Sequence, residues 1–134
     1  MRRKLLSAAL LLTASIALLA HPVSAGANSA ALFGKIHGQV RLSPICPVEV
    51  IPANPACSPR PYKTTIKIMS AKGDRLLKTL STNSVGYFRL TFPVGTYMLK
   101  TTGGSPYPRC ASELVKIAFN KNLKLSITCD SGIR

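Results

Sequence analysis

Apolar and polar residues alternate in short runs along most of the chain after residue 34, and turn-forming residues separate the runs. A period of two is typical of β-strands that bury one face and expose the other. No window in this part of the sequence sustains a helical period with start and stop signals. The pattern therefore predicts an all-β sandwich of seven short strands. The predicted strands are residues 35–42, 65–69, 75–81, 87–92, 96–100, 115–119 and 123–127.

Two of these runs, 87–92 and 96–100, are predicted to form a hairpin through the turn Pro93-Val94-Gly95. Their inward faces are expected to make the centre of the core. The inward residues are Phe88, Leu90 and Phe92 on the first run, Tyr97 and Leu99 on the second, and Val115, Ile117 and Phe119 on a later one. The run 75–81 has leucines that fit neither face, so we expect it at the edge of a sheet.

Residues 43–61 contrast with the strands, because they hold six of the ten prolines and two of the four cysteines. Proline has no N–H to donate to a strand ladder, so this segment is expected to lie outside the sheets. We predict an ordered loop that is held by a disulfide bond between its own cysteines.

The first 25 residues have the organisation of a helical signal peptide. A basic start at residues 1–4 precedes an apolar run from Leu5 to Ala20, which ends at His21-Pro22. Val23-Ser24-Ala25 then offers small residues for cleavage after Ala25. An uncleaved anchor is the alternative, but the run is shorter than the roughly 20 residues that span a bilayer. We expect a secreted or extracytoplasmic protein of the periplasm or cell envelope, with a signal peptide (1–25), a flexible segment (26–33) and one domain (34–134).

All four cysteines follow the predicted cleavage site, in a chain sent to a compartment where disulfide bonds persist. Three connectivities are possible. Closeness along the chain favours Cys46 with Cys57 and Cys110 with Cys129, each bond contributing about 3 kcal/mol in the chain-entropy model. The spacings contain no close pair of zinc ligands, and His37 is the only histidine after the cleavage site, so we expect no metal.

The net positive charge gives the main indication of a binding partner, which would be anionic. The formal net charge is +14, and it becomes +11 once the three basic residues of the signal peptide are removed. Seven cations on the outward phase of their strands make up a candidate anion-binding face: Lys35, Arg41, Lys67, Arg89, Lys100, Lys116 and Lys124. They form one basic face if Arg89 and Lys67 belong to the same sheet, and such a face suits phosphate-bearing envelope polymers or acidic glycans. The competing interpretation is a soluble coat that discourages strand-to-strand association.

Nucleic acid is a poor candidate partner, because the chain has no tryptophan and its tyrosines and phenylalanines are assigned to the core or turns. Two ion pairs are possible on the loops, Glu49 with Arg60 and Asp130 with Arg134. Exposed pairs contribute about 0 to 1 kcal/mol, so any special importance would come from recognition.

The pattern offers no catalytic centre. Nucleophilic catalysis needs a hydroxyl or thiol beside a base, but His37 lies alone on an outward strand face and every cysteine is expected in a disulfide bond. Paired-carboxylate chemistry needs two neighbouring acids, and the four acidic residues are scattered over separate segments. We expect neither catalytic residues nor a cofactor.

Three segments carry a resemblance to a known family: Gly34 to Val40, Asn83 to Phe88 and Phe92 to Tyr97. Together they resemble the carboxypeptidase regulatory-like (transthyretin or prealbumin-like) domain. Cys46-Pro47-Val48-Glu49, Cys57 with Arg60-Pro61, and the terminal 130–134 are similar to small exported bacterial proteins that carry this domain. The resemblance implies a seven-stranded prealbumin-like, immunoglobulin-like sandwich, which generally serves as an accessory, binding or stabilising module.

Transthyretin-like hydrolases that act on a purine-breakdown product use several histidines and a C-terminal Tyr-Arg-Gly-Ser signature. This chain lacks both, since it ends Ser-Gly-Ile-Arg. We therefore expect an exported, non-catalytic accessory or binding module that recognises protein or an anionic polymer. The alternatives are a structural surface component that self-associates and, least favoured, a hydrolase that depends on His37.

Overall fold

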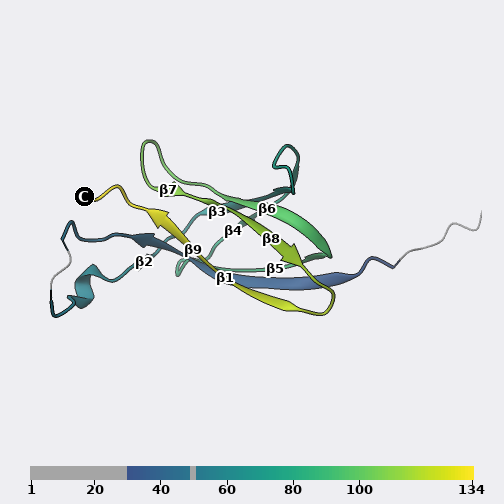
Figure 1. The fold of residues 1–134 in the computed structure, drawn as a ribbon, viewed down its shortest axis with the longest axis horizontal. Coiled ribbons are helices and arrows are strands. Elements are labelled where there is room, and N and C mark those ends of the chain that lie inside the picture. The colour runs from purple at the N-terminus through teal and green to yellow at the C-terminus, as the bar shows by residue number, and fades with distance from the viewer. Residues whose placement is uncertain (1–29, 49–50) are drawn as a thin grey trace, which may run out of the picture.

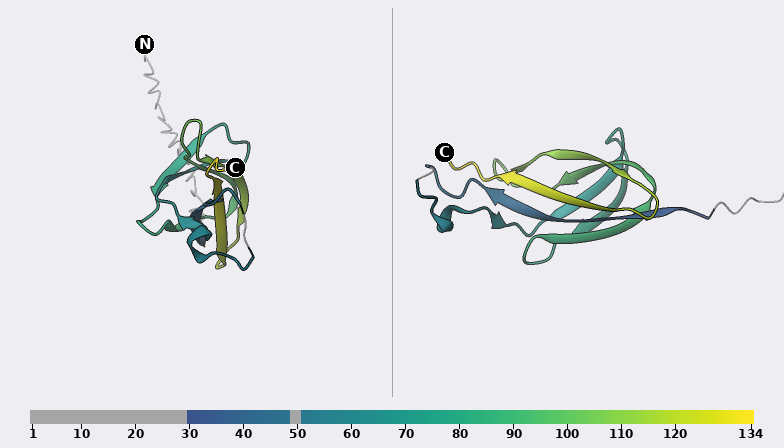
Figure 2. Two further views of the ribbon diagram at one scale, coloured as in Figure 1. Left: turned by 90° about the vertical axis from the view of Figure 1, so that its left-hand side faces the viewer. Right: turned by 60° about the horizontal axis from the view of Figure 1, so that its bottom comes forward.

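The computed structural model describes residues 30–48 and 51–134 as a two-layered β-sandwich (Figure 1). The predicted signal peptide, its cleavage site and Glu49 lie outside the described residues. Figure 2 shows the two layers along and across the long axis of the domain. The described chain enters at one end of this axis, and the C-terminus lies at the other.

One layer, sheet A, is built around a long central strand, β1. Its strands are β1 (Phe33–Ser43), β2 (Arg60–Pro61), β5 (Tyr87–Pro93), β7 (Arg109–Cys110) and β9 (Asn122–Asp130). On one side, β1 pairs with β5 and then with β2; on the other side it pairs in parallel with β9, whose end pairs with β7.

The second layer, sheet B, is antiparallel and has the order β4-β3-β6-β8. Its strands are β3 (Thr65–Ser70), β4 (Leu76–Ser81), β6 (Gly95–Thr101) and β8 (Ser112–Ile117). As expected for residues 75–81, β4 lies at the edge of the sheet, where Leu76 and Leu77 are exposed.

The core lies between the sheets and is filled by the inward residues of both. The buried apolar residues are Ile36, Val40, Phe88, Leu90, Ile127 and Cys129 from sheet A, and Ile66, Ile68, Leu99, Val115 and Ile117 from sheet B. Fully burying one side chain of this size stabilises a fold by about 1.5–3 kcal/mol. The predicted β-sandwich, with all seven expected strands, and the two disulfide bonds, Cys46–Cys57 and Cys110–Cys129, are confirmed.

The structure adds two short strands, β2 and β7, to the seven expected. The prediction that residues 43–61 lie wholly outside the sheets is wrong at their end, where β2 pairs Pro61 with Arg41. The next residue, Tyr62, donates its N–H to the carbonyl of Val40 at 2.9 Å. Because alternate residues of an antiparallel ladder face its partner, the nitrogen of Pro61 faces away from β1 and no ladder bond is lost. The rest of the segment contains a 3-10 turn, η1 (Pro55–Cys57).

The predicted hairpin of residues 87–92 and 96–100 is wrong, because β5 lies in sheet A and β6 in sheet B. The turn between them carries the chain across the sandwich. The rings of Phe92 and Tyr97 meet edge to face with centroids 5.0 Å apart, and the Tyr97 hydroxyl donates to the carbonyl of Pro93 at 3.1 Å. The two inward faces therefore oppose each other across the core instead of lying side by side.

A second crossing joins β8 of sheet B to β9 of sheet A. Asn120 adopts a left-handed conformation in this turn, with φ of 54°. The prediction that Phe119 faces the core is wrong: β8 ends at Ile117, and Phe119 lies in the crossing with 59% of its surface exposed.

Candidate anion-binding face

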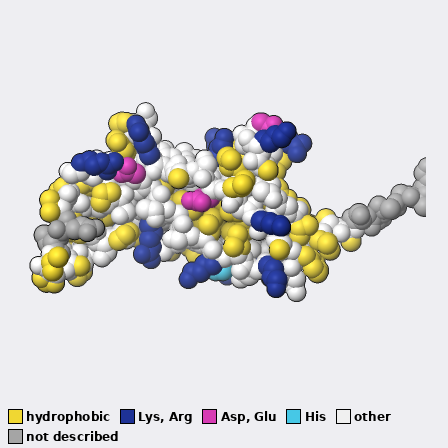
Figure 3. Space-filling model, in the orientation of Figure 1, with side chains coloured by type: hydrophobic (Ala, Val, Ile, Leu, Met, Phe, Trp, Pro, Cys, Tyr) yellow, Lys and Arg dark blue, Asp and Glu magenta, His cyan; other side chains and the backbone are white. Residues whose placement is uncertain are grey.

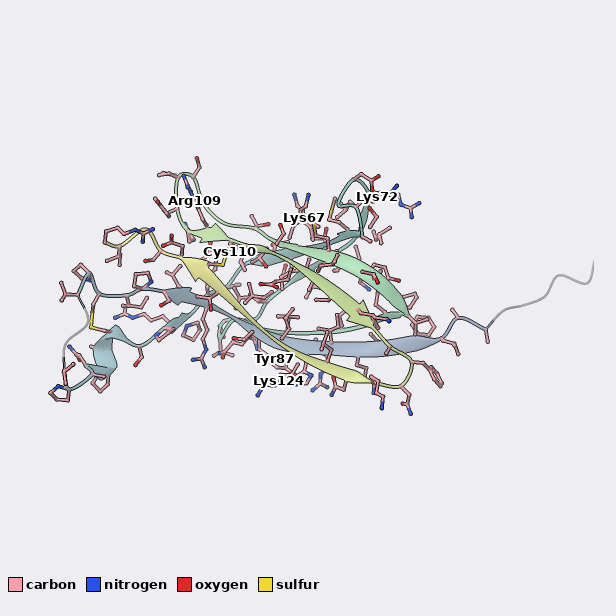
Figure 4. All side chains as sticks on the ribbon, viewed as in Figure 1. Lys67, Lys72, Tyr87, Arg109, Cys110 and Lys124 are labelled. Carbon is pink, nitrogen blue, oxygen red and sulfur yellow. A yellow bond between two sulfur atoms is a disulfide. The ribbon has the colours of Figure 1, made fainter. Side chains whose placement is uncertain are left out.

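The structure divides the seven predicted cations between the two sheets. Lys35, Arg41, Arg89 and Lys124 belong to sheet A, whereas Lys67, Lys100 and Lys116 belong to sheet B. A single face that carries all seven is thus excluded, because Arg89 lies in β5 of sheet A and Lys67 in β3 of sheet B. In Figure 4, Lys67 and Lys124 project from opposite sides of the sandwich.

Sheet A brings three basic side chains into one row. His37 of β1 pairs in register with Arg89 of β5 on one side and with Lys124 of β9 on the other. Neighbouring strands lie about 4.8 Å apart, so the row spans about 10 Å. Lys35 and Arg41 share the outward phase of β1 and extend the charge along the strand. We call these five residues the basic face of sheet A.

Hydrogen bonds from neighbouring side chains orient this face. The Nδ1 of His37 lies 2.8 Å from the acceptor Oδ1 of Asn122, so this bond requires the proton on Nδ1. The Nε of Arg41 donates to Oε1 of Gln39 at 2.9 Å, and Gln39 in turn donates to the carbonyl of Val85 at 2.8 Å. Gln39 thereby ties the cation on β1 to the turn before β5.

An open depression of about 560 Å³ adjoins the basic row. Its lining includes His37, Arg41 and Lys124, together with Tyr87 of β5. Figure 4 shows Tyr87 and Lys124 on the same side of the sheet. The Arg89 guanidinium donates to the Tyr87 hydroxyl at 3.4 Å, which places a third cation, after Arg41 and Lys124, at the margin of the depression. Aromatic, amide and cationic groups thus face one hollow.

Asp130 is the one described carboxylate on the outward phase of β1, β5 and β9, and it lies at the far end of β9, six residues beyond Lys124. Asp74 lies in the turn between β3 and β4, Glu113 lies in β8, and Asp130 ends β9. Within the described ranges, the single ion pair joins Asp130 to Arg134 at 2.7 Å. No described carboxylate therefore pairs with the basic face, and its positive potential is directed toward solvent. In Figure 3, the histidine lies among cationic side chains at the lower margin of the molecule.

The two predicted loop pairs have different outcomes. Asp130 and Arg134 form their pair through two hydrogen bonds. These bonds, followed by the hydrogen bond from the N–H of Gly132, are the main causes that lower the pKa of the carboxyl from 3.8 to about 2. The pairing of Glu49 with Arg60 stays a prediction, because Glu49 lies outside the described residues.

Other kinds of site find little support in the part of the chain that the structure describes. There, no three His, Cys, Asp or Glu residues gather closely enough to hold a metal ion. None of the described elements is a helix long and apolar enough to cross a membrane. The side chain that is hydrogen-bonded to His37 is an amide, which does not supply the carboxylate that orients the base in a catalytic triad.

Sequence reasoning missed Gln39, Tyr87 and Asn122 as members of this site. Gln39 and Tyr87 are outward residues of strands that were correctly expected, so the alternation alone could have identified them. Asn122 was expected in the turn before residues 123–127, whereas the structure makes it the first residue of β9. The alternation could not have placed Asn122 beside His37, because that contact depends on the parallel pairing of β9 with β1.

No protein-family model matches the sequence, and no curated protein matches it. In shape, the chain is similar to GBS52, the minor pilin of the Gram-positive pathogen Streptococcus agalactiae. The TM-score is 0.56 at 15% identity, and the match covers 75% of this chain and 45% of the pilin. It is also similar to a mutant of the shaft pilin SpaA from Lactobacillus rhamnosus GG, with a TM-score of 0.54, 9% identity and coverage of 74% and 50%. The chain spans half the length of these pilins or less, and likeness at such identities establishes only the β-sandwich fold.

Proposed function

We propose that this chain is an exported, non-catalytic β-sandwich module that binds an anionic polymer of the cell envelope through the basic face of sheet A. The observation that carries the proposal is the row of Arg89, His37 and Lys124, held in register on a face whose one described carboxylate, Asp130, lies at the far end of β9 and pairs with Arg134. A concentration of one sign of charge attracts polyanions and speeds their association.

An extracytoplasmic location is supported by three independent features. Residues 1–25 have the sequence pattern that predicts a signal peptide, the fold contains two disulfide bonds, and pilin domains are among the similar structures. Disulfide bonds persist in oxidising compartments and are rare in the cytosol. We also propose membership of the carboxypeptidase regulatory-like family, on the turn motifs around Gly86 and Gly95.

The dimensions of the face favour a polymer over a single ion. Lys35 and Arg41 are six residues apart on β1, which corresponds to about 20 Å along the strand. A chain of regularly spaced phosphates can contact the row and both of these cations at once, whereas a lone phosphate reaches only part of the face. Poly(glycerol phosphate) teichoic acid has this chemistry.

The test compares matched double variants on immobilised teichoic acid. Replacing Arg89 and Lys124 with glutamine is expected to weaken binding at least tenfold, because two contacts of about 1 kcal/mol each are lost. Lys67→Gln with Lys116→Gln removes the same charge from sheet B and is expected to change binding by less than about threefold. Equal losses in the two variants, or retention that is indifferent to salt, would overturn the proposal.

A structural, self-associating surface component is the second candidate. It is favoured by the edge strand β4, which leaves Leu76 and Leu77 exposed, and by the pilin domains among the similar structures. This function requires a concentration-dependent rise in mass without any ligand. Size-exclusion chromatography with light scattering at several concentrations measures it, and a constant monomer mass would remove this candidate.

A further inference from the structure

Four large apolar side chains are exposed at the end of the sandwich where the described chain begins (Figure 3). They are Leu32 (49% exposed), Phe33 (47%), Val94 (37%) and Phe119 (59%). They come from three separate places: the start of β1, the crossing from β5 to β6, and the crossing from β8 to β9. We call this group the apolar tip.

Backbone hydrogen bonds join the three segments of the apolar tip. The N–H of Val94 donates to the carbonyl of Leu32 at 2.9 Å, and the N–H of Asn120 donates to the carbonyl of Phe33 at 3.1 Å. These bonds hold the exposed side chains on one continuous surface instead of on independent loops. A contiguous exposed patch of this kind marks an interaction site more often than scattered single residues do.

Lysines border the apolar tip. Lys35 and Lys121 are both exposed, and both line a depression of about 240 Å³ that also includes Phe33. The N–H of Lys35 donates to the carbonyl of Lys121 at 2.8 Å, which keeps the two residues side by side. Lys116, opposite Thr96 at the start of β6, adds a cation at this end of sheet B.

Apolar side chains bordered by lysines are complementary to a membrane surface, in which apolar acyl chains lie beneath anionic headgroups. Phenylalanine and leucine enter the boundary between headgroups and acyl chains, while lysines reach anionic headgroups. The predicted cleavage site after Ala25 precedes Leu32 by few residues in the sequence, and the apolar tip is the end of the domain at which the described chain begins. A protein partner would require the same apolar contacts, but it would not require the three lysines that border the apolar tip.

We propose that the apolar tip, with Lys35 and Lys121, docks the domain on the surface of an anionic phospholipid membrane. Phe33 and Phe119 insert at the headgroup boundary, and the two lysines contact lipid phosphates. This orientation directs the long axis of the sandwich away from the membrane and leaves the other four residues of the basic face of sheet A, His37, Arg41, Arg89 and Lys124, open at its side. The proposal goes beyond polymer binding and does not depend on it.

A tryptophan reporter tests this docking directly, because the chain contains no tryptophan. Phe119→Trp places the reporter in the apolar tip, and Leu114→Trp places a matched control on the outer face of sheet B, where Leu114 is 62% exposed. The protein is recovered disulfide-bonded from the periplasm of an expression host, and mass spectrometry confirms that both variants have the same N-terminus. With vesicles of about three parts phosphatidylcholine to one part phosphatidylglycerol, only Phe119→Trp is expected to shift to shorter wavelength and to resist iodide quenching.

Vesicle sedimentation with a second set of variants shows whether binding depends on the apolar tip or on exposed leucine and lysine side chains elsewhere on the surface. Phe119→Ser with Lys121→Gln is expected to weaken binding more than tenfold, of which the lysine accounts for about fivefold. The matched control, Leu114→Ser with Lys63→Gln, removes an equally exposed leucine and an exposed lysine elsewhere and is expected to bind as the parent does. Pure phosphatidylcholine vesicles are expected to bind weakly.

Three results would overturn the proposal. Equal responses of the two tryptophan reporters would place the contact elsewhere. A blue-shifted Phe119→Trp spectrum without vesicles would show that a second copy or the N-terminal segment covers the apolar tip. Loss of vesicle binding in Arg89→Gln with Lys124→Gln, but not in the apolar-tip variant, would assign it to the basic face and support polymer recognition instead.

Discussion

At the scale of single residues, the C-terminal tail shows how local hydrogen bonds set the pKa of a carboxylate. Asp130 accepts hydrogen bonds from both terminal nitrogens of Arg134, at 3.1 and 2.7 Å, and from the N–H of Gly132 at 2.9 Å. The Ser131 hydroxyl donates to the carbonyl of Pro44, which ties the tail to the loop after β1. The hydrogen bond from Arg134 is the largest cause of the lowered pKa of Asp130. Gly132 has a φ of 82° in the segment between the two partners, a conformation that glycine adopts without steric cost.

Replacing Arg134 with alanine is expected to raise the pKa of Asp130 from about 2 toward 3.8, because the main hydrogen-bond donor to its ionised form is removed. The folded-state pKa lies below the unfolded one, so the pair stabilises the tail fully above about pH 4 and less as the pH falls through about 2. A carbon-detected NMR titration of the Asp130 carboxyl measures the shift. Arg60→Ala serves as the control, and an unchanged Asp130 titration in Arg134→Ala would contradict the prediction.

At the scale of elements, the two disulfide bonds hold different parts of the fold. Cys110 and Cys129 are a register pair of β7 and β9, and Cys129 is fully buried in the core. Cys46 and Cys57 instead close the loop between β1 and β2, which contributes no buried apolar side chain in its described part. One bond therefore supports packing, and the other restricts a loop.

Removing each disulfide bond in turn is expected to show that Cys110–Cys129 stabilises the fold more than Cys46–Cys57 does. Cys110→Ala with Cys129→Ala should lower the free energy of unfolding by about 3–5 kcal/mol, because the loss of buried volume adds to the loop entropy. Cys46→Ala with Cys57→Ala should cost about 2–3 kcal/mol, mostly from the loop entropy. Urea denaturation followed by circular dichroism measures both, and the reverse order would contradict this division of roles.

At the scale of the whole molecule, positive charge covers both sheets. Residues 26–134 carry fifteen Lys and Arg against four acids, if the three basic residues before Leu5 are subtracted from the eighteen in the sequence. Placing these cations on opposite faces limits the repulsion within each face, but the compact state still concentrates them more than the unfolded chain does. The fold is thus expected to be less stable at low ionic strength.

Adding sodium chloride from about 10 mM to about 300 mM is expected to raise the melting temperature by about 2–5 °C, because screening reduces this repulsion. Lys67→Gln with Lys116→Gln should raise the melting temperature at low salt and reduce its dependence on salt. Differential scanning calorimetry measures both effects. A melting temperature that falls with salt would show that attractive pairs, rather than repulsion, dominate the surface.

The sequence by itself determined most of the residues that face the core, with Phe119 as an exception, and most of the places where the chain turns. The alternation around Ile36, Ile68 and Phe88 predicted the buried faces, because a period of two follows directly from strand geometry. Closeness along the chain favoured the observed disulfide pairing, since short loops close at lower entropic cost. The leucines of residues 75–81 indicated an edge strand, because an edge has no second neighbour to enforce alternation.

Only the tertiary structure decided which strand lies beside which. Phe92 and Tyr97 have the same pattern whether their strands pair in a hairpin or oppose each other across the core, so the sequence could not distinguish the two arrangements. The same ambiguity concealed the separation of Arg89 from Lys67 and the alignment of His37 with Lys124. Inward-facing positions follow from local geometry, whereas neighbours are selected by the packing of the complete core, and the basic face exists only once that selection is made.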